Sequence, residues 1–278
     1  MIWDKFHTLQ ADTAGLSEVN LDWRLIPAED SLWARGRLYS HGPVKAAQAH
    51  NHHPKPRNKS QVGGCITMAF ERMLPRCIST TKDPSGLGRW ISQLFEGKGN
   101  HKARLVSGYF PCKSTAGEHT VYTQHKDHFR SRAADEDDSA SDREPHQAWL
   151  EDFQEEIEKW LEDDEKIVIR LDANSDVRTG PVAAMLRELG FEEQVTFRHG
   201  GNRDPPGTHM ANTKGVPIDG VWTNFAHGQM RCGYLDFAEG LPGDHHTVWI
   251  DLPADELFGY TPPDLHKVFP PDLVASDP

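Results

Sequence analysis

Carboxylates, an amide and an imidazole that follow strand-like runs could bind a hard divalent cation and position a water molecule for hydrolysis. The apolar run 167–171 leads directly into Asp172, with Asn174 two residues later. The run 216–218 leads in the same way into Asp219. The pattern indicates a hydrolase site built at the ends of strands.

Two more places in the sequence repeat this arrangement. Asp244 and His245 stand directly before the run 246–250, and Glu18 follows the short run 14–17. Each of these motifs alone has a structural explanation, since Asp-x-Asn sequences are typical of turns and helix caps. Their shared placement at strand ends favours one joint site.

The elements that must position these residues are mostly strands. Strands are predicted over 13–19, 61–70, 76–80, 90–95, 103–110, 166–172, 216–223 and 246–252. Helices are predicted over 2–10, 116–132, 145–163 and 181–189, from apolar residues at helical spacing. The helices fall between groups of strands and do not alternate strictly with them. This favours an α+β fold, with a two-layer sheet core and helices packed outside.

The composition limits the function classes. Thirty basic residues against 42 acidic ones give a net charge of −12, whereas a generic nucleic-acid binder needs surplus positive charge. Some of the acids belong to the candidate metal site, and others form the loop 135–142. Four cysteines without a CxxC pair, with neither a signal peptide nor a membrane-spanning run, favour an intracellular protein of the nucleus or cytoplasm.

The proline content divides the chain into two parts. Residues 1–253 read as one domain, and residues 254–278 read as a proline-rich tail or linker. A histidine-rich loop at 50–53 leaves a zinc site open as a minor alternative. His209 and His246 are assigned structural roles.

Taken in order, the motifs resemble those of the endonuclease/exonuclease/phosphatase (DNase I-like) superfamily. The matching segments are Ser17–Asn20, Gly63–Gly64, Ser107–Pro111, Leu171–Asn174, Pro217–Asp219 and Gly243–His245. The resemblance implies a four-layer α/β/β/α sandwich and a Mg²⁺ cofactor, with Mn²⁺ as the alternative ion. On this resemblance we expect the family's first strand, and the supporting Asn at the end of that strand, to be missing from this sequence.

The resemblance also implies roles for the site residues. Glu18 and Asp244 would ligate the metal, while Asp172 would orient or deprotonate the attacking water and Asn174 would hydrogen-bond the phosphate or the water. His245 would contact a phosphoryl oxygen, held in place by Asp219, and Tyr109 would donate a hydrogen bond to a phosphate oxygen.

One dipeptide refines the resemblance. Thr208-His209, followed by Pro217–Trp222, looks most like the endonuclease domains of non-LTR retrotransposons and reverse-transcriptase polyproteins. That branch implies a DNA substrate, no membrane partner, and a reverse-transcriptase region in the full-length protein. Two alternatives stay open: a phosphatase of a small substrate such as an inositol phosphate, and a degenerate, non-catalytic binding domain.

Overall fold

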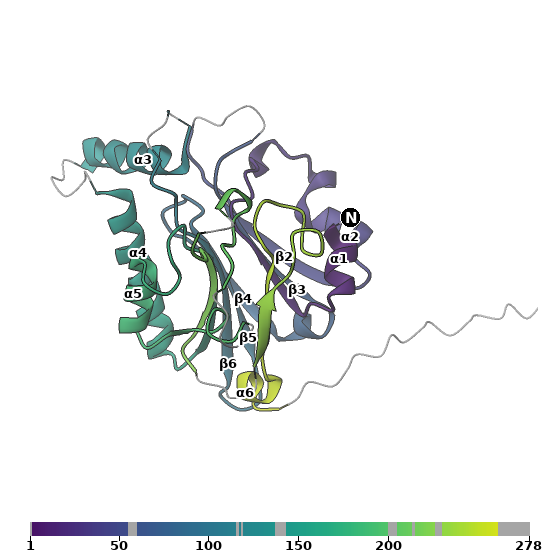
Figure 1. The fold of residues 1–278 in the computed structure, drawn as a ribbon. Coiled ribbons are helices and arrows are strands. Elements are labelled where there is room, and N and C mark those ends of the chain that lie inside the picture. Colours follow the sequence, from purple (N-terminus) through teal and green to yellow (C-terminus); the bar gives the residue numbers. More distant parts are fainter. Residues whose placement is uncertain are drawn as a thin grey trace, which may run out of the picture.

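The computed structural model describes residues 2–54, 60–114, 117, 119–136, 143–199, 205–212, 215–225 and 230–260. Its largest element is a six-stranded sheet (Figure 1). The strand order is β4 (Cys77–Lys82), β5 (Trp90–Glu96), β6 (Lys102–Tyr109), β7 (Lys166–Asp172), β9 (Asp219–Thr223) and β8 (Glu192–Glu193). Strands β6 and β7 are parallel, and the other neighbours are antiparallel.

Two smaller antiparallel sheets form the second strand layer. One has the order β1 (Thr13–Leu16), β3 (Cys65–Phe70) and β2 (Val44–Ala49), and the other pairs β10 (Arg231–Tyr234) with β11 (Val248–Asp251). The first sheet packs against β5 and β6, and β11 packs against β9. The two strand layers therefore face each other across an apolar interior.

Helices cover both outer faces of this core (Figure 1). Helices α4 (Pro145–Glu162) and α5 (Pro181–Glu188) lie against the large sheet, and α1 (Ile2–Thr8) and α2 (Leu32–Tyr39) lie against the smaller one. Helix α3 (Val121–Glu136) precedes α4, and α6 (Ala254–Phe258) follows β11. Short 3₁₀ turns lie at 23–25, 28–30, 71–76 and 210–212. The α+β fold with two packed strand layers between helices is confirmed.

Side-chain alternation explains these layers. Along β3, Ile66, Met68 and Phe70 pack under α1 and α2, whereas Ala69 faces the interior between the sheets. Along β7, Ile167, Ile169 and Leu171 pack under α4 and α5, and Val168 faces the interior. Asp172 shares the parity of Val168, so the alternation directs it toward the second strand layer.

Helix α4 shows how local sequence sets the outer layer. Trp149, Phe153, Ile157 and Trp160 recur at helical spacing and are all buried against the large sheet. The helix begins at Pro145, where a missing N–H is harmless, and the Glu144 carboxylate accepts the Gln147 N–H as a cap.

Several elements differ from the sequence-based expectation. Strands β2, β8 and β10 were not anticipated, and α3 begins at Val121, later than the expected 116. Beyond the expected boundary at 253, α6 buries Leu257 and Phe258 in the interior cluster, while 261–278 lie outside the described residues. Among the described residues, every helix is too short or too polar to cross a membrane.

Candidate active site

Strand register brings three of the predicted site residues into one row. Tyr109 at the end of β6 pairs with Asp172 at the end of β7, and Asp172 pairs with Asp219 at the start of β9. Directly paired residues lie on the same face of a sheet, about 5 Å apart. The row therefore places one phenol and two carboxylates side by side, although these three residues are far apart in the sequence and other strands and helices lie between them.

His245 closes this row from the loop before β11. Its Nδ1 lies 2.7 Å from the Asp219 Oδ2, so the carboxylate fixes the ring and leaves Nε2 for a ligand. Burial opposes a charge on this ring, but the hydrogen bond to Asp219 and the charges of Asp219, Asp172 and Asp244 raise the pKa of His245 to about 9. The imidazole is thus a cation at neutral pH.

Asp172 is the buried carboxylate of the site. Its burial, followed by the negative charge of Asp219, raises the pKa of Asp172 well above its usual value, and the charge of Glu18 adds to this effect. His245 and the backbone N–H of Asn174 act in the opposite direction, the latter by donating to the Asp172 Oδ1 at 3.0 Å. Asn174 in turn donates its side-chain amide to the Phe110 carbonyl at 2.8 Å.

Glu18 reaches the site from the turn after β1. The turn is tied to a second one, because Val19 and Asn20 donate their backbone N–H groups to the Gly64 and Gly63 carbonyls. Both glycines have positive φ, and so does Glu18, at 50°. A non-glycine residue in this region is uncommon and marks a strained position that the surrounding structure must hold.

Glu18 lies at the rim of the site and is partly exposed to solvent. Its carboxylate is nevertheless partly desolvated by the surrounding residues. That desolvation, together with the nearby charge of Asp244, raises the pKa of Glu18. His245 and hydrogen bonds from Tyr109 and Asn20 act against the rise. The Tyr109 hydroxyl thus lies beside the Glu18 carboxylate, and its contact with a phosphate oxygen stays a prediction.

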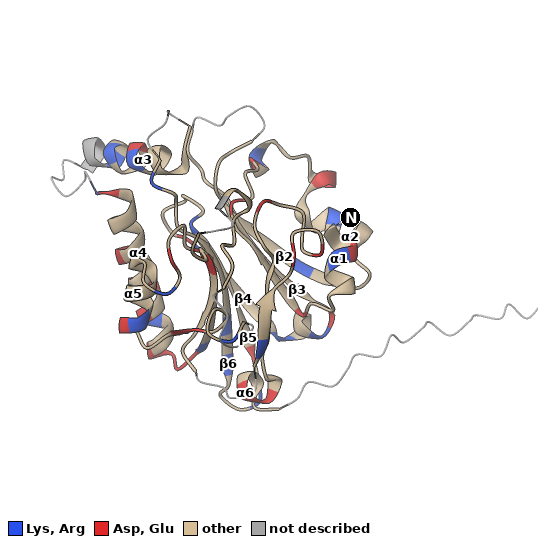
Figure 2. Ribbon diagram, in the orientation of Figure 1, with Lys and Arg blue, Asp and Glu red and all other residues tan. Residues whose placement is uncertain are grey.

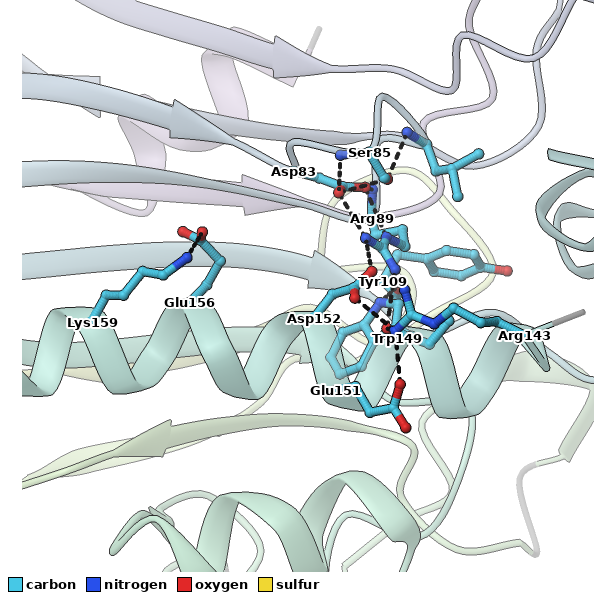
Figure 3. A network of polar contacts seen from close by, with 12 residues as sticks. Asp83, Ser85, Arg89, Tyr109, Arg143, Trp149, Glu151, Asp152, Glu156 and Lys159 are labelled. Atoms are coloured by element: carbon cyan, nitrogen blue, oxygen red, sulfur yellow. Dashed lines mark hydrogen bonds and ion pairs between the residues drawn. The ribbon is translucent and has the colours of Figure 1, made fainter. Parts of the chain in front are cut away.

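The backbone of Tyr109 is held on both sides by buried groups. Its N–H donates to the Arg89 carbonyl at 2.9 Å, and its carbonyl accepts the Trp149 Nε1–H at 2.9 Å (Figure 3). Arg89 itself bonds Asp83 and Asp152. The site tyrosine is consequently anchored to the core of the large sheet and to α4.

The donor set fits a divalent cation. Four carboxylates, those of Glu18, Asp172, Asp219 and Asp244, gather around one imidazolium, and Asp172 and Glu18 interact with other carboxylates in a way that raises their pKa. Oxygen ligands of this kind are what Mg²⁺ prefers. Within the described residues, two groups place their ligand atoms within 4.8 Å of one another: Asp172, Asp219 and His245, and His209, Asp244 and His245.

The predicted metal pair needs one qualification. Asp244 belongs to one of these groups, but Glu18 belongs to neither. Asp244 is also open to solvent, with its side chain 73% exposed. The histidines at 50, 52 and 53 are in neither group, so the described residues there give no support to a zinc loop.

Sequence reasoning missed two residues at this site. Thr208 is fully buried, and its hydroxyl accepts the N–H groups of Ile218 and Asp219, which sets the start of β9. His209 pairs with His245 through a backbone bridge, and its Nε2 lies 3.4 Å from the Asp244 Oδ2. Sequence reasoning uses Thr208-His209 as a branch marker and assigns His209 a structural role; the short distance of the dipeptide from Asp219 in the chain is the signal that could have found it.

Comparisons with known proteins identify the fold. No protein-family model and no curated protein matches the chain. Solved structures do match: the Xenopus laevis APE2 catalytic domain has a TM-score of 0.57 at 11% identity, covering 90% of this chain and 87% of that one. The human Nocturnin catalytic domain has a TM-score of 0.53 at 15% identity, with 88% and 81% covered.

A third match is the Neisseria 3′ phosphatase NExo, solved with a product DNA hairpin, with a TM-score of 0.51 at 15% identity, covering 90% of this chain and 95% of that one. An endonuclease/exonuclease/phosphatase family protein from Leptotrichia buccalis matches at a TM-score of 0.54 and 12% identity, with 91% of each chain covered. At these identities the likeness speaks for the fold alone. The chain therefore has the DNase I-like fold of the endonuclease/exonuclease/phosphatase structures.

Proposed function

We propose that the protein is a Mg²⁺-dependent phosphodiester hydrolase that cuts DNA, as the endonuclease domain of a retroelement protein with a reverse-transcriptase region. The observation that carries the proposal is the row Tyr109, Asp172 and Asp219 with the His245–Asp219 pair beside it. Solved proteins of the same fold include a phosphatase with bound DNA product, which supports phosphoester chemistry.

Asp172 is assigned the role of the base. Asn174 holds one of its oxygens, and the other is assigned to the attacking water. A carboxylate with a raised pKa is a better proton acceptor than an ordinary Asp, provided that it is ionised at the working pH. A cation near the site would keep it ionised, because positive charge stabilises the carboxylate.

His245 is assigned the role of a hydrogen-bond donor to the phosphoryl oxygen that gains negative charge during the reaction. Asp219 holds Nδ1, so the N–H at Nε2 is available to donate to that oxygen, and the positive charge of the ring strengthens the bond. Glu18 and Asp244 are assigned as the residues that would hold Mg²⁺, or Mn²⁺ in its place. The bound ion supplies Lewis-acid stabilisation of the phosphoryl charge.

Plasmid nicking with and without Mg²⁺ tests the proposal. The wild-type protein is expected to convert supercoiled DNA to open circles only with the metal, and Asp172→Asn or His245→Gln protein should lose that activity. Asp251→Asn is a matched control, because this carboxylate at the end of β11 is exposed and paired with Arg231. Cutting that needs no metal, or that persists in both site variants, contradicts the proposal.

The net charge of −12 fits a second candidate no worse than DNA cleavage: a phosphatase of a small phosphorylated substrate such as an inositol phosphate. Figure 2 shows acidic and basic residues interspersed over the helices and strands. Phosphate release from inositol polyphosphates without DNA nicking would select this candidate. A protein whose melting temperature does not rise at millimolar Mg²⁺ would instead be a non-catalytic binding domain.

A further inference from the structure

His209 lies beside a residue that the proposed function assigns to the metal. It follows Thr208, whose carbonyl accepts the His246 N–H at 2.8 Å, and the next residue, Met210, donates its N–H to the Asp244 carbonyl at 2.7 Å. With the bridge between His209 and His245, these bonds fix the backbone of 208–210 against that of 244–246. The position of the backbone that carries the His209 ring is thus set by the fold.

The hydrogen bonds of the ring define its donor atom. The Nδ1 of His209 accepts the backbone N–H of Ala211 at 3.2 Å. A neutral imidazole carries one proton, so when Nδ1 accepts, the proton is on Nε2. That Nε2 lies 3.4 Å from the Asp244 Oδ2, so its proton faces the carboxylate at ion-pair distance.

The same observation separates two roles for His209. A ring that ligates a metal through Nε2 must present a lone pair there, which would require a proton on Nδ1 and the loss of the bond from Ala211. The bond from Ala211 and the 3.4 Å contact of Nε2 with Asp244 match the other role, in which the ring holds a ligating carboxylate. Asp244 needs such a partner, because its side chain is 73% exposed and free rotation would scatter its oxygens.

We infer that His209 is a positioning residue that donates from Nε2 to Asp244 and holds the second oxygen of that carboxylate toward the cation shared with Glu18. The inference rests on the proposed function, since it concerns the same metal site. Outer partners of this kind typically change metal affinity by about 10- to 100-fold when they are removed. His209 does not touch the reacting atoms in this role.

The effect of His209 on metal affinity can be measured without relying on activity. The electron-paramagnetic-resonance signal of free Mn²⁺ decreases as the ion binds to the protein, and this decrease gives the dissociation constant. His209→Ala is expected to raise the Mn²⁺ dissociation constant about tenfold. Turnover at saturating metal should stay within about threefold of the wild type, because the reacting groups are unchanged. His209→Gln, which keeps an N–H donor, should recover most of the affinity.

His41→Ala is the matched control. Its Nε2 also pairs with a carboxylate, the Oδ1 of Asp4 at 2.9 Å, but His41 lies in the turn after α2 and Asp4 on α1, in the outer layer. Its Mn²⁺ affinity should equal that of the wild type, and the melting temperatures of all variants report that they fold.

Three results would overturn the inference while leaving the proposed function standing. They are a His209→Ala protein that binds Mn²⁺ as the wild type does, a loss of turnover without a change in affinity, and a His209→Gln protein as weak as His209→Ala. The second would assign the ring to substrate, and the third would assign it to the metal itself. A wild-type protein that binds no Mn²⁺ and cuts no DNA would remove the proposed function and this inference together.

Discussion

Two groups of charged side chains lie near the same end of the large sheet, and they are assembled in opposite ways. Around Arg89, each charge has a partner: the guanidinium bonds Asp83 at 2.8 Å and Asp152 at 2.8 Å, and the side chains of Arg89 and Asp83 are fully buried (Figure 3). Burial alone would raise the pKa of Asp83, but the charge and hydrogen bonds of Arg89 outweigh it and lower that pKa.

At the candidate site, carboxylates face other carboxylates. Burial and the charge of Asp219 raise the pKa of Asp172, and the same causes, with Asp244 as the neighbour, raise that of Glu18. A fold that can pair Asp83 so completely has the means to pair Asp172, so the difference is the reason for proposing the second group as the functional site. The Arg89 group serves the structure, whereas at the site four carboxylates surround one imidazolium, and a bound cation would neutralise more of their charge.

The largest effect is expected for Asp172→Asn, which removes the buried carboxylate of the candidate site. We expect the hydrolase activity to fall by about 10²- to 10⁴-fold, the range of a lost general base. We also expect the metal-free protein to melt a few degrees higher. The folded-state pKa of Asp172 is raised, so its ionised form destabilises the fold above about pH 4, and the amide has no such charge.

Nicking assays and thermal unfolding in a chelator measure these two effects. A variant that loses activity and also melts well below the wild type would show that Asp172 stabilises the fold, and the contrast with Asp83 would then be wrong.

Arg89→Met should, in contrast, lower the stability of the folded protein. Removing one partner of a buried ion pair leaves Asp83 uncompensated, so the free energy of unfolding should fall by about 3–5 kcal/mol. Urea unfolding measures it. Arg231→Met is the control, because the Arg231–Asp251 pair has side chains that are 81% and 53% exposed, and its loss should change stability by less than about 1 kcal/mol. Equal losses in the two variants would contradict the structural role of the Arg89 group.

The third and smallest effect is expected at low pH, where protonation of the buried His125 near the Arg89 group should lower the stability of the fold. This ring is buried in α3, and neither nitrogen has a hydrogen-bond partner in the part of the chain that the structure describes. Burial, then the charge of Arg89, lowers the pKa of His125 to about 3. The stability that depends on the neutral ring is therefore complete above about pH 6.5 and is lost as pH falls toward 3.

His125→Leu should lessen this acid sensitivity by up to about 1.4 kcal/mol per pH unit, the limit for one proton. Unfolding midpoints measured between pH 7 and 4 for the variant, the wild type and the exposed control His41→Leu give the comparison. Parallel pH curves for the variant and the wild type would mean that His125 is not neutral in the folded protein.

Much of the fold followed from local sequence. The predicted strand 166–172 coincides with β7, because a run buried on both faces is apolar at nearly every position. The helix over 145–163 was recognisable because its apolar stripe repeats at helical spacing. Strand β2 was missed, since Val44–Ala49 offers only Val among strong strand formers, and its pairing with β3 decides its conformation.

The sequence by itself determined which residue types stand at the strand ends: Asp172, Asp219, Asp244, His245 and Glu18. It did so because apolar runs and the polar residues that end them are local patterns. It also predicted the α+β class. The roles assigned to these residues remain predictions that the variants above would test.

Only the tertiary structure decided which of these residues meet. The row of Tyr109, Asp172 and Asp219 depends on the register of three strands that are far apart in the chain, and register is a property of pairing. The tertiary structure also brought His209 against Asp244 and paired Asp83 with Arg89 while leaving Asp172 among acids. The pKa and the role of a titratable group depend on its neighbours in space, and the spacing of residues along the chain does not show which residues those neighbours are.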